Sequence, residues 1–164
     1  MSKMTEKRYK SLPAGVRNNN YLNIKKSKAR WRGSRKVQRN HPFVEFDNPA
    51  WGYRAAFIIM GKSYRKRGIK TVADIISTWA PNSENNTAMY IAYCHSELIN
   101  RFKLRKPKEI EMPEPLSLNA FGYWTALAKA MTAVEIGRKY ADDPQTERYI
   151  YEGYIMAFCE DKYP

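Results

Sequence analysis

Five stretches of the chain carry apolar residues at the three- and four-residue spacing of a helix. In the first, Tyr53, Phe57, Met60 and Tyr64 share one face, after a start signal in which Asp47 or Asn48 precedes Pro49. Four more helices are expected, over residues 71–79, 83–102, 119–137 and 146–161. The segment 103–117 contains three prolines and mixed charge, which predicts a surface loop.

Short alternating apolar groups replace the helical pattern between residues 16 and 46. They read "YLNI" and "FVEF", and Gly33 and Pro42 punctuate the segment between them. Such groups favour short strands. The expected fold is therefore mainly α, of the α+β lysozyme-like type, with about five helices and a small N-terminal β-hairpin lobe. We expect a mobile basic arm at 1–15 and one domain at 16–164, divided into a β-lobe (16–46) and a helical lobe (47–164).

The composition favours a folded chain without a cofactor. Of the residues, 43% are hydrophobic and 13% aromatic, which is enough apolar surface to offset chain entropy. The two cysteines favour no disulfide framework, and zinc spacings, a Walker loop and G-x-G-x-x-G are missing from the sequence. No metal or other cofactor is expected.

The longest apolar run, "AAFIIMG", is far shorter than a membrane span, and the N-terminus lacks the apolar core of a signal peptide. The expectation is a protein made in the cytoplasm with no membrane partner. If it acts outside a cell, another component must deliver it.

Positive charge is concentrated near the N-terminus. The formal net charge is +13, and residues 1–39 hold 13 Lys and Arg against the single acid Glu6. The remaining residues are nearly balanced, with 16 basic and 15 acidic side chains. Such a block indicates an anionic partner, which nucleic acid, a bacterial wall or an acidic protein surface would each satisfy.

Three segments carry a family likeness. They are "GVRNNNYLNIKKS", "FVEFDNPAWGYRAAF" and "TVADIISTWAPNSENNTAMYIAY". Together they resemble a family of small phage and prophage-type proteins that are often described as virion structural proteins. The chain departs from that pattern at Tyr21, where the family usually has proline, and at Lys25, where it usually has arginine. The resemblance implies association with a virion.

A second likeness concerns chemistry. The order N-x-L-N-I-K, then W-x-G, then F-x-x-F is similar to the β-lobe of glucosaminidases in the lysozyme-like superfamily. Those enzymes carry an acid in a Glu-x-Gly context at the end of a helix that precedes the lobe. Here that helix is missing, and Glu135-Ile136-Gly137 ends a helix near the other end of the chain. The resemblance implies a circularly permuted arrangement with Glu135 as general acid.

The helical pattern also places Glu135 among apolar side chains. At 100° per residue it lies about 20° from Trp124, along the apolar stripe of its helix. Apolar surroundings disfavour the ionised carboxylate and raise its pKa, as acid catalysis requires. The alternative is a structural ion pair with Arg54 or Arg138.

A glycosidase normally needs a second carboxylate. Glu45 and Asp47 are the acids in or beside the predicted lobe, and Glu45 is the candidate partner, although its alternation with Val44 and Phe46 also fits a solvent-facing strand residue. Glu84 belongs to the family pattern, but its position at the start of a helix has a simpler explanation than catalysis, because a carboxylate there stabilises the helix N-terminus.

Polar and aromatic side chains of the lobe are candidates for sugar binding. Asparagines can instead hold turns together through hydrogen bonds from side chain to backbone. The candidate substrate-binding residues are Asn18, Asn19, Asn20, Asn23, Trp31 and Trp79.

The sequence therefore supports three hypotheses. The first is a phage or prophage-encoded protein directed at peptidoglycan, an active or decayed wall glycosidase. The second is a non-enzymatic virion protein whose basic arm contacts virion proteins or packaged DNA. The third is a cytoplasmic nucleic-acid-binding protein, whose affinity would fall steeply with salt.

Overall fold

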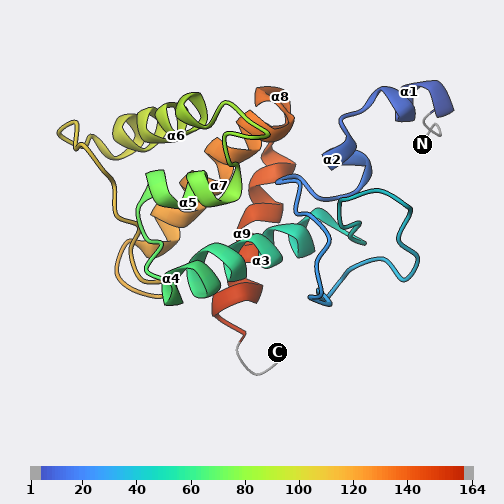
Figure 1. Cartoon of the computed structure of the whole chain (residues 1–164), viewed down its shortest axis with the longest axis horizontal. Helices are drawn as coiled ribbons and strands as arrows, with labels where there is room; N and C mark the ends of the chain where they lie inside the picture. Colours follow the sequence, from blue (N-terminus) through green and yellow to red (C-terminus); the bar gives the residue numbers. More distant parts are fainter. Residues whose placement is uncertain (1–4, 161–164) are drawn as a thin grey trace.

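The computed structural model describes residues 5–160, so the first four residues of the expected basic arm lie outside the described part (Figure 1). The secondary structure of residues 5–160 consists of helices joined by turns and loops. In chain order the elements are α1 (Glu6–Ser11), α2 (Ala14–Arg17), α3 (Pro49–Ile58), the π-helical turn η1 (Ile59–Ser63), α4 (Tyr64–Lys66), α5 (Val72–Trp79), α6 (Thr87–Phe102), α7 (Ala120–Ile136), α8 (Arg138–Ala141) and α9 (Pro144–Phe158).

The five expected helices are present as α3, with its continuation through η1 and α4, and as α5, α6, α7 and α9. Their starts follow ordinary capping chemistry. The side chains of Asn48, Asn86 and Asp143 accept hydrogen bonds from backbone N–H groups in the first turns of α3, α6 and α9. The segment between α6 and α7 is a loop, as its prolines predict.

The centre of the molecule is the contact between α3 and α9, which lie against each other in Figure 1. Gly153 of α9 makes this approach possible. A methyl group at Gly153 would lie 2.6 Å from Tyr53 Cβ and 3.0 Å from the carbonyl oxygen of Ala50. A larger residue at this position would force the two helices apart.

A buried hydrogen bond joins α3 to α7. The Tyr53 hydroxyl donates to Thr132 Oγ1 at 2.6 Å, and the Thr132 hydroxyl donates to the Ala128 carbonyl at 2.8 Å. Both side chains are buried, so each polar group has its partner inside the core. The bond fixes the last turns of α7, where Glu135 lies.

The predicted β-hairpin lobe at 16–46 is wrong. In the described residues this part of the chain contains isolated bridges, Lys25 with Phe43 and Ser34 with Phe46, and no strand or sheet. The two apolar groups do meet, since Val44 N–H donates to the Ile24 carbonyl at 3.0 Å. The fold of the described residues is therefore all-α. The expected α+β class is wrong because the β-hairpin lobe on which it depended is not formed.

Side chains take the hydrogen bonds that a strand ladder would use. The buried Asn20 amide donates to the carbonyls of Ile24 and Val44, both at 2.9 Å, and its oxygen accepts from Ile24 N–H. Gln38 similarly accepts from Glu45 N–H and donates to the Glu45 carbonyl, both at 2.8 Å. These bonds satisfy buried backbone groups without a partner strand, so the segment folds as irregular turns.

The irregular segment 18–48 packs against the first turn of α3 (Figure 1). Gly33 has a φ of 77°, and a Cβ there would lie 2.0 Å from Trp51 Cγ, so the tryptophan ring occupies the space above its backbone. Asp47 N–H donates to the Gly33 carbonyl at 2.8 Å. Glycine is therefore required at position 33 by both conformation and space.

Candidate functional site

Glu135 lies in the last turn of α7, partly buried, and its carboxylate is bound by neutral side chains. Asn23 Nδ2 donates to Oε1 at 3.1 Å, and the Tyr90 hydroxyl donates to Oε2 at 3.0 Å. The Trp79 side chain also hydrogen-bonds to this carboxylate. No lysine or arginine of residues 5–160 forms an ion pair with it, so the structural pairing with Arg54 or Arg138 is not formed.

Burial raises the pKa of the Glu135 carboxyl above its ordinary value, and the three donors limit the rise because they favour the ionised form. The helix acts in the same direction as burial, because the C-terminal end of a helix carries partial negative charge. Gly137, with a φ of 109°, ends α7 directly after Ile136. The result is a carboxyl that holds a proton at higher pH than an exposed glutamate.

Asn23 reaches Glu135 because the turn before it is rigid. Its backbone has a φ of 54°, a left-handed conformation that asparagine tolerates better than most residues. The three bonds of Asn20 fix the turn, and α2 closes it from the other side. A Cβ at Gly15 of α2 would lie 2.9 Å from Ile136 Cγ2 and 3.0 Å from Asn23 Oδ1, so only glycine allows this contact.

A cavity of about 540 Å³ opens beside Glu135. Its polar lining includes Asn23, Trp79 and Glu84, with Lys25 at the same wall. Lys25 and Glu84 are half-exposed and form an ion pair with each other. Two carboxylates from different elements, the end of α7 and the turn before α6, thus line one cavity.

This cavity continues into a second one of about 380 Å³. Asn23, Lys25, Trp79 and Glu84 line both, and Trp31 lines the second. Of the sequence-predicted residues, Asn23 and Trp79 therefore line the cavity of Glu135, and Trp31 lies in the adjoining one. Tryptophan rings beside amide and carboxyl groups are the surfaces that sugars stack on and hydrogen-bond to.

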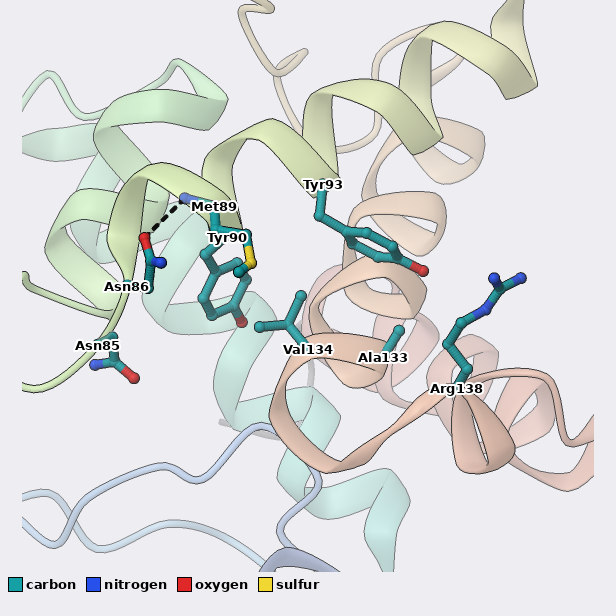
Figure 2. A pocket seen from close by; sticks show the side chains of 8 residues that line it. All are labelled: Asn85, Asn86, Met89, Tyr90, Tyr93, Ala133, Val134 and Arg138. Carbon is teal, nitrogen blue, oxygen red and sulfur yellow. Dashed lines mark hydrogen bonds between the residues drawn. The ribbon is translucent and has the colours of Figure 1, made fainter.

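A third cavity, of about 310 Å³, lies between α6 and α7 (Figure 2). It shares Asn85 with the Glu135 cavity, and Tyr90, which binds Glu135, forms part of its wall. The three cavities follow one another, with Glu135 at the middle one.

Glu45 is buried elsewhere and pairs with cations. Its Oε1 lies 2.9 Å from Arg35 Nη1 and 2.7 Å from Arg39 Nη2, and its Oε2 accepts from Arg39 N–H at 2.7 Å. Although desolvation opposes them, the bonds and charge of Arg39, with Arg35, lower the pKa of Glu45 to about 2. Glu45 does not line the Glu135 cavity, and its side chain is 1% exposed, so it does not face solvent either.

The first three asparagines of the candidate set make contacts within the irregular segment. Asn18 Oδ1 accepts from Arg39 Nη2 at 3.4 Å, and Asn19 Nδ2 donates to the Phe46 carbonyl at 3.1 Å. Asn20 is fully buried. These side chains are not among those that line the Glu135 cavity, and Asn23 alone of the four asparagines reaches it.

Sequence reasoning missed Tyr90 and misplaced the role of Glu84. Asn86 caps α6, while the Glu84 carboxylate pairs with Lys25 at the cavity. Tyr90 lies one helical turn after Asn86, and nothing in the local pattern distinguishes it from an ordinary core tyrosine. What distinguishes Tyr90 is that its helix packs against α7, and this contact is known only from the three-dimensional structure.

Residues 5–160 contain no helix that is long and apolar enough to cross a membrane, and no group of three or more His, Cys, Asp or Glu side chains that could hold a metal ion.

The chain is related to a phage protein. Over 82 residues it is 39% identical to Protein P5 of Pseudoalteromonas phage PM2, a match that covers 48% of this chain and 51% of the phage protein. The chain thus matches about half the length of this curated relative. No family model matches the chain.

Proposed function

We propose that this protein cleaves glycosidic bonds of peptidoglycan, with the Glu135 carboxyl as general acid. The observation that supports this most is the environment of Glu135. A carboxyl with a raised pKa, bound only by neutral donors, lines a cavity together with tryptophan and asparagine side chains. Structural carboxylates are usually paired with cations, and this one is not.

The hydrogen bonds determine which oxygen carries the proton. Asn23 Nδ2 can only donate, so it stabilises Oε1 as an acceptor. The Tyr90 hydroxyl at Oε2 can rotate and accept instead. In the protonated acid the proton therefore belongs on Oε2, and it passes from there to the glycosidic oxygen of a bound sugar.

Glu84 is the second carboxylate of this proposal, in place of Glu45. It lines the same cavity as Glu135 and extends into the adjoining one that contains Trp31. Its charge would stabilise the positive charge that develops on the sugar ring or activate the attacking water. Lys25, its ion-pair partner, holds it on the cavity wall.

The test is the release of reducing sugars from purified peptidoglycan by Glu135→Gln. Glutamine keeps the size of the side chain but cannot give up a proton to the glycosidic oxygen, so activity should fall about 1000-fold. Glu152→Gln removes an exposed carboxyl of α9 and is the matched control, with unchanged activity expected. Equal activity of Glu135→Gln and the wild-type chain would exclude Glu135 as the acid.

A second candidate is a virion component without catalysis that binds an anionic polymer such as packaged DNA. The basic segment, residues 25–39, supports it with eight Lys and Arg and no acid. A cavity of about 570 Å³ in this segment is lined by Lys26, Arg30, Arg35 and Lys36, with Trp31. The similarity to a phage protein is compatible with both candidates.

The salt dependence of DNA binding tests the second candidate. Each phosphate contact releases counterions, so affinity should fall steeply as salt rises, and Arg30→Glu with Lys36→Glu should flatten that dependence. The same double variant should leave sugar release from peptidoglycan intact if the two activities are separate. A salt-independent affinity would count against this candidate.

A further inference from the structure

The cavity between α6 and α7 differs in chemistry from the two that adjoin it. Met89, Tyr90 and Tyr93 of α6 face Ala133 and Val134 of α7, so its walls are mostly apolar (Figure 2). Met89 is 61% exposed and Val134 41% exposed, although both are large apolar side chains. Apolar side chains left open beside a polar catalytic cavity favour a ligand that is not a sugar.

The two ends of this cavity are polar, and they are not alike. Figure 2 shows Asn85 and Asn86 at one end and the Arg138 guanidinium at the other. Asn85 also lines the Glu135 cavity, so the amide end is the entrance from the catalytic site. A ligand that enters there runs along the apolar walls and ends at a positive charge.

Arg138 is available for a carboxylate. Its side chain is 73% exposed, and its ion pair in the described residues is one contact of 3.9 Å, from Nε to Asp142 Oδ2. The guanidinium fork binds a carboxylate through two parallel hydrogen bonds, which is a stronger arrangement than this long contact.

We propose that this cavity binds the acidic peptide that peptidoglycan carries on its amino sugars, an inference that rests on the proposed function. Alanine methyl groups of such a peptide would contact Val134 and Tyr93, its amides would bond to Asn85 at the entrance, and a carboxylate would pair with Arg138. Because Asn85 lines both this cavity and that of Glu135, a peptide bound here would leave its sugar in the cavity that contains the acid. The site therefore selects glycan strands that carry peptides over unsubstituted ones.

The experiment measures binding by calorimetry in the Glu135→Gln background, where no ligand is cleaved. The probes are a tetramer of N-acetylglucosamine, a muropeptide of four sugars with free peptide carboxylates, the same muropeptide with amidated carboxylates, and the free peptide. We expect the acidic muropeptide to bind about tenfold more tightly than the bare tetramer, and amidation to remove most of that advantage.

Two variants and one control identify the cavity. Arg138→Gln removes the cation, and Met89→Asp introduces a negative charge into the apolar wall at the third position of α6, where an acid stabilises a helix. Each should abolish the advantage of the muropeptide. Lys129→Gln removes a charge from α7 beside a different cavity and should leave the advantage unchanged.

Equal affinity for the bare tetramer and the acidic muropeptide would overturn the proposed peptide site. It would also be overturned if Arg138→Gln and Met89→Asp both still bound the muropeptide more tightly than the tetramer. These results would leave the glycosidase proposal standing if the wild-type chain still released reducing sugars. Conversely, Arg138-dependent binding of the free peptide without any binding of sugars would support the peptide site and overturn the glycosidase.

Discussion

Glu135 and Glu45 are both at least partly buried, yet the pKa values of their carboxyl groups shift in opposite directions. Glu45 is surrounded by the guanidinium groups of Arg35 and Arg39, and its pKa falls to about 2. Glu135 has only neutral donors, and its pKa rises. The difference shows that burial alone does not decide the protonation state of a carboxyl: the charge of its partners decides whether its pKa falls or rises.

Glu45 and Glu135 should differ most in how much each side chain contributes to the free energy of unfolding. Glu45→Gln leaves Arg35 and Arg39 without their anion, so we expect the free energy of unfolding to fall by about 3 kcal/mol. Glu135→Gln should change it by less than about 1 kcal/mol, because no cation loses a partner. Chemical denaturation of both variants at neutral pH measures the contrast, and similar losses would show that the two sites do not differ as described.

The pH dependence of stability should have opposite signs at the two sites. The contribution of Glu45 is present above its ordinary pKa of 4.5 and is lost as the pH falls toward 2, so the deficit of Glu45→Gln should shrink over that range. Glu135 favours its neutral form, so its ionisation costs stability as the pH rises through its raised pKa. Glu135→Gln should therefore gain stability relative to the wild-type chain as the pH rises from 4.5, the ordinary pKa, through the raised pKa, which denaturation curves measure.

A smaller effect concerns the donors to Glu135. Tyr90→Phe removes the hydroxyl at Oε2, which favours the ionised form, so the pKa of Glu135 should rise further. The alkaline limb of the pH–activity profile should move to higher pH by the same amount. Tyr123→Phe, on α7 but without a bond to Glu135, keeps the ring that stacks on Phe102 and is the control. If the alkaline limb of the pH–activity profile stayed at the same pH in Tyr90→Phe, Glu135 would not be the acid that titrates there.

The smallest effect is expected at the exposed ion pair of the cavity. Lys25→Met should change the free energy of unfolding by less than about 1 kcal/mol, because Lys25 and Glu84 are half-exposed and solvent screens them. Thermal denaturation measures this. A loss as large as that of Glu45→Gln would mean that the rim of the cavity supports the fold in the same way as the Glu45 cluster.

The helices could be predicted from the sequence because their signals are local. Asn48, Asn86 and Asp143 cap α3, α6 and α9, and the apolar stripe of α7 is sufficient to predict that Glu135 lies on a packed face. The hydrogen bond between Asn23 and Glu135 was not predicted as such. The family resemblance implied only that Glu135 would lie beside the N-terminal segment that contains Asn23. Their roles in sugar binding and catalysis stay predictions.

The irregular segment could not be predicted because its hydrogen bonds are made by particular side chains. "YLNI" and "FVEF" have the alternation of strands and do approach each other, but Asn20 and Gln38 take the bonds of a ladder. The same turns bury Glu45, for which strand alternation predicts a position that faces solvent or sugar. Which side-chain amide bonds to which backbone carbonyl depends on the final packing, so a periodic sequence pattern does not predict it.

The bond between Asn23 and Glu135 joins residues 112 positions apart. At about 5 to 20 residues per second, a ribosome adds Glu135 about 6 to 22 s after Asn23. During that interval the ribosome adds the other residues that line the cavity, and Glu135 comes last. A cell that makes this protein is therefore exposed to an assembled site only when translation of α7 is complete, and fragments that terminate early would carry none.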